Sequence, residues 1–262
     1  MAFATGAVLL LAATVAAAGI PASRISGGVN ADISDYPFVV QLERDNTGSG
    51  WSQTGGGVLI NNLNFITAAH KFTDASFKGP NSFRIRAGSN KRNSGGTTYS
   101  IRTITIHPEF AEEAERDADI AVVRLTRAVE FTDLVSPAAL YGGSYEVPEG
   151  SEVTVVGWGK TGPLDAKPSE LLQELTLHTI NYDECAARYG FGVTPNMICY
   201  GNLDSDERDS PCFGDAGGPV IYNGGVIGLI SWGQSCANSY FASVGTSVPA
   251  YVDWVVDVAI AP

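Results

Sequence analysis

Short runs of apolar residues alternate with clusters of glycine and polar residues along most of the chain. Residues 38–42, 57–60 and 83–87 form such runs in the first half, and residues 153–157 and 171–180 form them in the second. Runs of this length, bounded by turn-forming residues, are typical of short antiparallel strands. The 30 glycines fit a fold with many tight turns. From Pro249 onward the apolar positions follow helical spacing, which predicts a C-terminal helix.

The first 18 residues form an uncharged apolar run that ends in an Ala-x-Ala site at residues 16–18. This pattern is typical of a secretory signal peptide. A transmembrane anchor is the alternative, but the run is shorter than the roughly 20 residues that span a bilayer. We therefore expect a secreted, extracellular protein whose cysteines are paired in an oxidising compartment. For Cys185, Cys199, Cys212 and Cys236, three pairings are open.

Composition narrows the classes of partner. The chain of 262 residues carries 28 acidic and 16 basic residues, a net charge of −12, which argues against binding to nucleic acid or to an anionic membrane surface. Its three histidines form no His-x-x-x-His pattern, and Cys-x-x-Cys is absent, so we expect neither a metal nor another cofactor. We expect a monomer with two halves of similar length, joined over residues 128–149 with a boundary near residues 135–148.

Five short motifs follow one another along the chain. They are Thr-Ala-Ala-His at residues 67–70, Asp-Ala-Asp-Ile-Ala at 117–121, Gly-Trp-Gly at 157–159, Gly-Asp-Ala-Gly-Gly-Pro at 214–219 and Ser-Trp-Gly at 231–233. Taken singly, each has a plain structural explanation, such as a glycine-rich turn or a structural histidine. Their order and spacing resemble those of the trypsin and chymotrypsin family of serine proteases, over nearly all of the chain after Arg24.

The resemblance implies an all-β fold of two six-stranded antiparallel β-barrels with a C-terminal helix and a site between the barrels. After a signal peptide at residues 1–18 and an activation propeptide at 19–24, it implies a trypsin-like domain over residues 25–262. The first barrel would cover about residues 25–135, and the second barrel with the helix about 136–262. By position, the resemblance also implies the disulfides Cys185–Cys199 and Cys212–Cys236.

The same resemblance assigns catalytic positions. His70 takes the place of the general base, and Asp119 takes the place of the carboxylate that orients it. The backbone amides of Gly214 and Ala216 take the place of the oxyanion hole, which receives the charge that develops on the substrate oxygen. The nucleophile position holds Ala216 where the family has serine. Because a methyl group cannot attack a carbonyl, the resemblance implies a catalytic site without its nucleophile.

A further set of residues resembles the activation site of these proteases. In the family, cleavage after a basic residue frees an Ile or Val amine, which pairs with the aspartate before the nucleophile and orders the oxyanion loop. Carried over to this chain, cleavage after Arg24 would free the amine of Ile25 to pair with Asp215. Ser26 stands where the family usually has valine, so insertion is expected to be less favourable.

The specificity pocket implied by the resemblance departs from the family pattern. Counting back from Ala216, the residue that sets primary specificity is Ser210, which would suit apolar or aromatic side chains. If Pro211 is an insertion, the role passes to Asp209, which would suit Lys or Arg. The remaining pocket positions are Ser231, Trp232, Gly233 and Ser243. Ser243 stands where the family has glycine, and its side chain would make the pocket shallower.

One disulfide of the family is missing beside the histidine. Its two positions hold Gly55 and Lys71, so no unpaired thiol remains. A native disulfide stabilises a small secreted domain by roughly 2 to 5 kcal/mol, and a domain of this size should fold without it. We expect a looser loop around His70, which matters more to an enzyme than to a binding protein.

Two functions fit these observations. The first is a secreted protease homologue that is catalytically inactive and binds a peptide or protein without cleaving it. The second is a secreted endopeptidase of the trypsin and chymotrypsin type, whose serine was altered by engineering or by a sequence error. The departures at Ser26, Gly55, Lys71 and Ser243 favour the first function, because a single altered position would not explain them.

Overall fold

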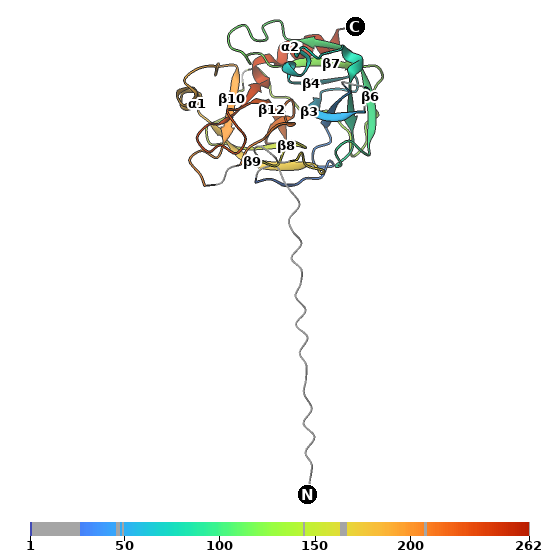
Figure 1. Cartoon of the computed structure of the whole chain (residues 1–262). Helices are drawn as coiled ribbons and strands as arrows, with labels where there is room; N and C mark the ends of the chain where they lie inside the picture. Colours follow the sequence, from blue (N-terminus) through green and yellow to red (C-terminus); the bar gives the residue numbers. More distant parts are fainter. Residues whose placement is uncertain are drawn as a thin grey trace.

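The structure is a computed structural model that describes residue 1 and residues 27–45, 48, 50–143, 145–162, 167–206 and 209–261. Its strands form two barrels, the first coloured blue to green in Figure 1 and the second yellow to red. A helix follows the last strand at the C-terminus. The predicted all-β fold of two six-stranded antiparallel barrels with a C-terminal helix is confirmed.

The first barrel closes in the order β2-β3-β4-β7-β6-β5, and each neighbouring pair is antiparallel. Alternation of apolar and polar residues builds it, as β5 shows: Phe83, Ile85 and Ala87 are buried, whereas Arg84 and Arg86 are partly exposed. Its strands are β2 (Val39–Arg44), β3 (Ser52–Leu59), β4 (Asn64–Thr67), β5 (Phe83–Ala87), β6 (Thr97–Ile106) and β7 (Ala121–Leu125), with the 3-10 helices η1 (Ala69–Phe72) and η2 (Pro80–Ser82) between them.

The second barrel follows the order β9-β10-β13-β12-β11-β8 and is closed by pairing of β8 with β9. Its strands are β8 (Glu152–Gly157), β9 (Gln173–Ile180), β10 (Met197–Gly201), β11 (Pro219–Tyr222), β12 (Gly225–Trp232) and β13 (Ser243–Ser247). The expected division of the chain near residues 135–148 falls between the last strand of the first barrel and the first strand of the second.

Each end of the chain crosses to the other barrel. Strand β1 (Val29–Asn30), at the N-terminal end of the described chain, pairs with β9 of the second barrel. Helix α2 (Val248–Ile260) follows the second barrel, yet Asn64 of β4 donates a hydrogen bond to the carbonyl of Ala259 (3.1 Å). The two barrels are therefore tied together at both ends, although their strands occupy separate parts of the sequence.

A buried apolar cluster joins the two barrels. It combines Val58 and Ile66 of the first barrel with Val156 and Leu229 of the second, and Tyr251 of α2 packs into it. Because both barrels contribute to one cluster, separating them would expose apolar surface to water at a cost of about 25 cal/mol per Å². The two barrels therefore share one apolar core.

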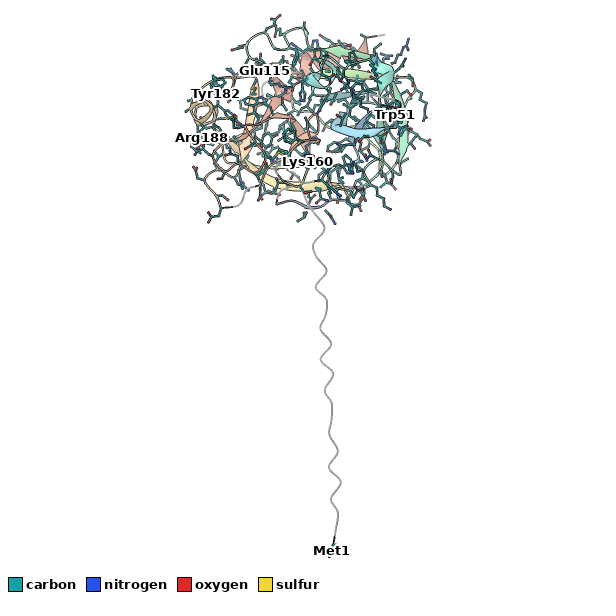
Figure 2. The ribbon with its side chains drawn as sticks, in the orientation of Figure 1. Met1, Trp51, Glu115, Lys160, Tyr182 and Arg188 are labelled. Carbon is teal, nitrogen blue, oxygen red and sulfur yellow. A yellow bond between two sulfur atoms is a disulfide. The ribbon has the colours of Figure 1, made fainter. Side chains whose placement is uncertain are left out.

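Both disulfides implied by the resemblance are formed. Cys185 of helix α1 (Tyr182–Tyr189) bonds to Cys199 of β10, and Cys212 bonds to Cys236. The side chain of Asn181 caps α1 by accepting from the amide of Asp183 (2.8 Å). Figure 2 shows Tyr182 and Arg188 of α1 at one edge of the molecule and Trp51 at the opposite edge.

Glu43 of β2 is fully buried and holds two arginines of β5. Arg84 Nε and Arg86 Nε each lie 2.6 Å from one of its carboxylate oxygens. Removing one partner of a buried ion pair leaves the remaining charge without its counterion. We expect Glu43→Gln to lower the free energy of unfolding by about 3 kcal/mol, measured by urea denaturation. The control is Glu152→Gln on the exposed surface of β8, which should change stability little; equal effects would contradict the prediction.

Among the described residues, no helix is both long and apolar enough to cross a bilayer. The apolar run at residues 1–18, on which the expectation of a signal peptide depends, lies outside the described residues apart from Met1.

Candidate active site

Three separate elements bring the predicted catalytic positions to one place between the barrels. His70 lies in η1, directly after β4, and Asp119 lies just before β7. Because β4 pairs with β7, with Thr67 opposite Ala121, the histidine and the aspartate meet at the same end of this strand pair. His70 Nδ1 lies 2.7 Å from Asp119 Oδ2. Ala216 lies in the loop before β11 and lines the same cavity as His70.

Asp119 is fully buried, and several donors surround its carboxylate. The backbone amide of His70 donates to Oδ1 (2.8 Å), and the hydroxyl of Ser231 donates to Oδ2 (2.5 Å). The hydroxyl of Thr246 fixes the backbone at this point by donating to the carbonyl of Asp119 (2.9 Å). Residues of both barrels thus hold the carboxylate in position. Ser231, predicted for the specificity pocket, has this additional contact that the sequence did not indicate.

The charges of this pair follow from its surroundings. Burial raises the pKa of Asp119, but the hydrogen bonds from His70 and Ser231 and the electrostatic interaction with His70 outweigh burial and leave that pKa below its usual value. Burial lowers the pKa of His70 more than Asp119 raises it, so the imidazole is neutral at neutral pH. Since an ionised carboxylate only accepts, Nδ1 must carry the proton, and Nε2 is left as the basic nitrogen.

The loop around Ala216 keeps a fixed shape. The carbonyl of Ala216 accepts from the amide of Gly56 (3.0 Å), and the amide of Gly217 donates to the carbonyl of Ile230 (2.7 Å). Gly214 has a φ of 104°, a conformation that side chains rarely adopt, and its carbonyl accepts from Gln53 Nε2 (2.7 Å). Both barrels therefore brace the loop. That the amides of Gly214 and Ala216 bind an oxyanion stays a prediction.

Asp215 is buried directly behind Ala216. Its Oδ1 accepts from the amide of Gly159 (2.7 Å), and its Oδ2 accepts from the amide of Cys212 (2.9 Å). Burial raises its pKa to about 6 despite these bonds. Its predicted partner Ile25 and the predicted cleavage site Arg24 lie outside the described residues, as does Ser26. Pairing of Asp215 with a new amine stays a prediction.

The raised pKa of Asp215 gives the uncleaved chain a specific pH dependence. Asp215 has a pKa of about 6 in the folded chain, compared with its ordinary value of 3.8. The protonated carboxyl therefore stabilises the fold below about pH 4, and this stabilisation is lost as the pH rises through 6. The expected loss is on the order of 3 kcal/mol. It is measured as urea midpoints of an uncleavable Arg24→Gln chain from pH 4 to pH 7.

The control for this pH dependence is the same chain with Asp215→Asn, which should not show that loss. Identical pH profiles for the two chains would contradict the assignment to Asp215. Cleavage after Arg24 should also flatten the profile, because a new amine beside the carboxylate would favour its charged form.

A cavity of about 290 Å³ opens beside Ala216 and includes part of the predicted specificity pocket. Both barrels line it, and sequence reasoning did not assign a site role to Arg116 or Phe213 in its wall. Phe213 is an exposed aromatic side chain, with 69% of its surface accessible. The predicted pocket residues that line this cavity are Ser231, Trp232, Gly233 and Ser243.

The two candidates for primary specificity do not line this cavity. Ser210 is buried, and its hydroxyl accepts from the amide of Ala237 (2.7 Å). Asp209 lies against the N-terminal segment: a Cβ placed on Gly27 would lie 1.8 Å from its Oδ1. Counting along the chain could not locate these side chains, because their direction depends on the fold of the surrounding loops.

The side chain of Lys71 lies where the family's missing disulfide would be. Its Nζ donates to the carbonyl of Thr54 (3.0 Å), and a Cβ placed on Gly55 would lie 3.1 Å from its Cε. The side chain therefore links η1 to β3, which a disulfide between these positions would also do. Lys71 also lines the cavity beside Ala216. The sequence identified the exchange of residues here but not this position in the cavity wall.

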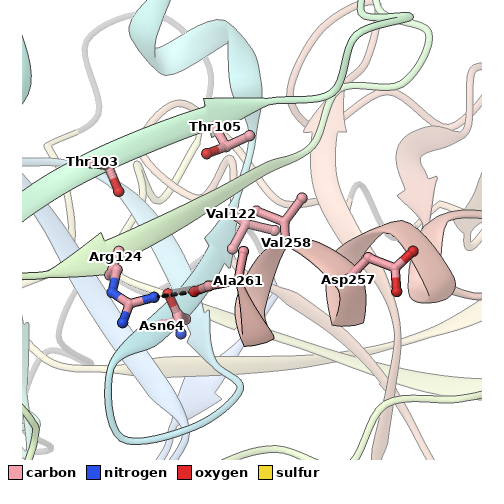
Figure 3. A pocket seen from close by; sticks show the side chains of 8 residues that line it. All are labelled: Asn64, Thr103, Thr105, Val122, Arg124, Asp257, Val258 and Ala261. Atoms are coloured by element: carbon pink, nitrogen blue, oxygen red, sulfur yellow. Dashed lines mark hydrogen bonds between the residues drawn. The ribbon is translucent and has the colours of Figure 1, made fainter.

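A second cavity, of about 390 Å³, lies between β6, β7 and the end of α2, as Figure 3 shows. Arg124 donates to the carbonyl of Ala261 across it (2.6 Å). It contains none of the predicted catalytic positions, and it is not assigned to the candidate site. In the described parts of the chain, no group of three or more His, Cys, Asp or Glu could hold a metal ion.

Comparisons with known proteins identify the family and agree with the fold. The family model described as Trypsin matches residues 25–255. Alkaline trypsin B of Manduca sexta is 38% identical over 256 residues, which cover 94% of this chain and 96% of the relative. Trypsin CFT-1 of Choristoneura fumiferana is 36% identical over 252 residues, with coverage of 95% and 96%. The chain therefore belongs to the trypsin and chymotrypsin family of serine proteases.

Proposed function

We propose that this protein is a catalytically inactive member of its family that binds a peptide or protein without cleaving it. The observation that carries the proposal is the methyl side chain of Ala216 at the nucleophile position, in a loop that hydrogen bonds to both barrels hold in place. Without a hydroxyl, no acyl-enzyme can form by the usual route. Loss of the nucleophile in a serine protease lowers turnover by roughly 10⁶.

The remaining parts of the site support binding. The cavity beside Ala216 is lined by Trp232 and Phe213, whose flat apolar surfaces suit peptide side chains. The amides of Gly214 and Ala216 are proposed to donate to a ligand carbonyl, as the oxyanion hole of an active relative would. In a site that does not turn over, such a contact contributes to affinity alone.

Export and activation belong to the same proposal. We propose that residues 1–18 direct secretion and that cleavage after Arg24 frees Ile25 to pair with Asp215, so that the loop of Ala216 becomes fully ordered. The support is the apolar N-terminal run, together with the buried Asp215, whose pKa is raised by burial although two backbone amides donate to its carboxylate. The protein is proposed to act as a monomer, without nucleic acid, membrane or cofactor.

Binding is tested with the cleaved chain and pools of fluorescein-labelled octapeptides. We expect saturable binding by fluorescence anisotropy and no new cleavage products by mass spectrometry after prolonged incubation. The matched variant is Trp232→Ala, which removes the largest apolar side chain of the cavity wall and should weaken binding. Cleavage of the peptides by the unaltered chain would contradict inactivity, and the absence of binding to any pool would contradict the binding role.

The second candidate function is a secreted endopeptidase whose serine was altered. The observation that favours it is the retained pair of His70 and Asp119, whose 2.7 Å contact and neutral imidazole suit a general base. A binding protein would not need this pair in working order. The two functions differ in how much activity returns when the hydroxyl is restored.

A further inference from the structure

We infer that Lys71 makes the cavity beside Ala216 selective for ligands that carry a carboxylate. The inference rests on the proposed binding function and adds the chemistry of the ligand. Three features of the cavity wall support it. The charged side chains of the wall are positive, the Lys71 ammonium is held in one position, and this ammonium has N–H groups available to a ligand.

The charged side chains of the cavity wall have one sign. Among the described residues that line it, Lys71 and Arg116 carry positive charges, His70 is neutral at neutral pH, and no Asp or Glu is present. The whole chain carries a net charge of −12, so this positive wall differs from the rest of the molecule. A cleft lined by one sign of charge concentrates ligands of the opposite sign.

Lys71 differs from an ordinary surface lysine because its side chain is held in place. Its stem passes the small residue Gly55, where any larger residue would bring a Cβ to 3.1 Å from Cε. Its Nζ donates to the carbonyl of Thr54 (3.0 Å). An exposed lysine loses rotamer freedom when it binds an anion, which offsets much of the gain. Here that freedom is already restricted in the unbound protein.

The ammonium has donors available for a ligand. It carries three N–H groups, and in the described part of the chain Thr54 provides its one hydrogen-bond acceptor. A ligand carboxylate could accept the others as charge-assisted hydrogen bonds, which are stronger than neutral ones. The amide of the same shape, Gln in place of Glu, would offer one neutral acceptor and no charge.

The buried carboxylates of Asp119 and Asp215 attract Lys71 through their charge, but their hydrogen bonds go to other groups. Asp119 is engaged by His70 and Ser231, and Asp215 is engaged by two backbone amides. The other charged groups that act on Lys71 are Arg116 and Arg44, both positive. Burial lowers the pKa of Lys71 to about 8, so the ammonium form predominates at neutral pH and is lost in the alkaline range.

Acidic side chains in an adjoining cavity confine the preference for a carboxylate to one part of the site. Glu113 and Glu115 line an adjoining cavity together with Arg116, and they would repel an anionic group placed there. The carboxylate is therefore expected at the end of the site where Lys71 lies. A peptide position that contacts the adjoining cavity should show no preference for an acidic residue.

The test compares pairs of fluorescein-labelled octapeptide pools that have Glu or Gln at one fixed position and are otherwise identical. Binding to the cleaved chain is measured by anisotropy at pH 7. At one position we expect about tenfold tighter binding of the Glu pool, the size of a hydrogen bond to a charged group. Lys71→Met, which keeps an apolar stem of similar length, should abolish that difference. Lys91→Met, an exposed lysine that does not line the cavity, should keep it.

Two measurements on the unaltered chain do not depend on the folding of a variant. The Glu preference should fall as the pH rises from 7 to 9.5, because Lys71 loses its proton, and it should fall in 0.5 M salt, because ions screen the attraction. Equal binding of the Glu and Gln pools at every position would overturn this inference and leave the binding function intact. Failure of all pools to bind would overturn the binding function and this inference with it.

Discussion

Ala216→Ser, cleaved after Arg24, is expected to hydrolyse peptide substrates at least about 10³-fold faster than the unaltered chain. The reason is that the nucleophile is the missing part of a site whose base is in place: Asp119 is buried, ionised and 2.7 Å from His70. A serine hydroxyl at this position would have a neutral imidazole in the same cavity to take its proton. The measurement is initial rates on peptides that end in Lys, Arg or an aromatic residue.

The size of the gain separates the two candidate functions. A revertant that reaches the full difference of roughly 10⁶ known for loss of a protease nucleophile would favour an enzyme altered at one position. A smaller gain would favour a protein whose site has drifted, since Lys71 and Ser243 alter the cavity wall as well. The control is the double variant Ala216→Ser with His70→Ala, which should return to the rate of the unaltered chain. Comparable hydrolysis by the unaltered chain and the revertant would contradict the role given to Ala216.

In the active Ala216→Ser background, Asp119→Asn should lower turnover by about 10⁴, the effect known for this exchange in serine proteases. Both oxygens of Asp119 accept hydrogen bonds, Oδ1 from the His70 amide and Oδ2 from His70 Nδ1. An asparagine has one oxygen and one NH₂ group. In one orientation the NH₂ group would face the backbone amide of His70, which is also a donor. In the other it would donate to Nδ1, so that the imidazole proton moves to Nε2 and this nitrogen can no longer act as the base.

The matched control is Asp117→Asn in the same background. Asp117 is also a buried aspartate of the same motif, but its Oδ1 accepts from the hydroxyl of Thr194 (2.5 Å), away from the histidine. It should retain most of the turnover. If Asp117→Asn and Asp119→Asn lowered turnover equally, the loss would reflect folding and not the orientation of His70.

The sequence predicted those parts of this protein that short-range patterns encode. The alternation in β5, with Phe83 and Ile85 inward, shows directly in the order of residues, because successive side chains of a strand face opposite sides. The strands and the C-terminal helix followed from such patterns. The resemblance added the barrels and the two disulfides, since a fixed order of motifs is preserved when loops vary.

The tertiary structure alone decided where side chains of neighbouring loops point. Counting along the chain could not show that Ser210 bonds Ala237 or that Asp209 lies against Gly27, because both contacts join segments far apart in sequence. The same holds for the hydrogen bond that Ser231 donates to Asp119 in addition to those from His70. The identity of Ala216 was plain from the sequence and already removed the nucleophile. That Lys71 fills the place of a disulfide and brings a charge to the same cavity depends on packing between η1 and β3, which only the folded chain reveals.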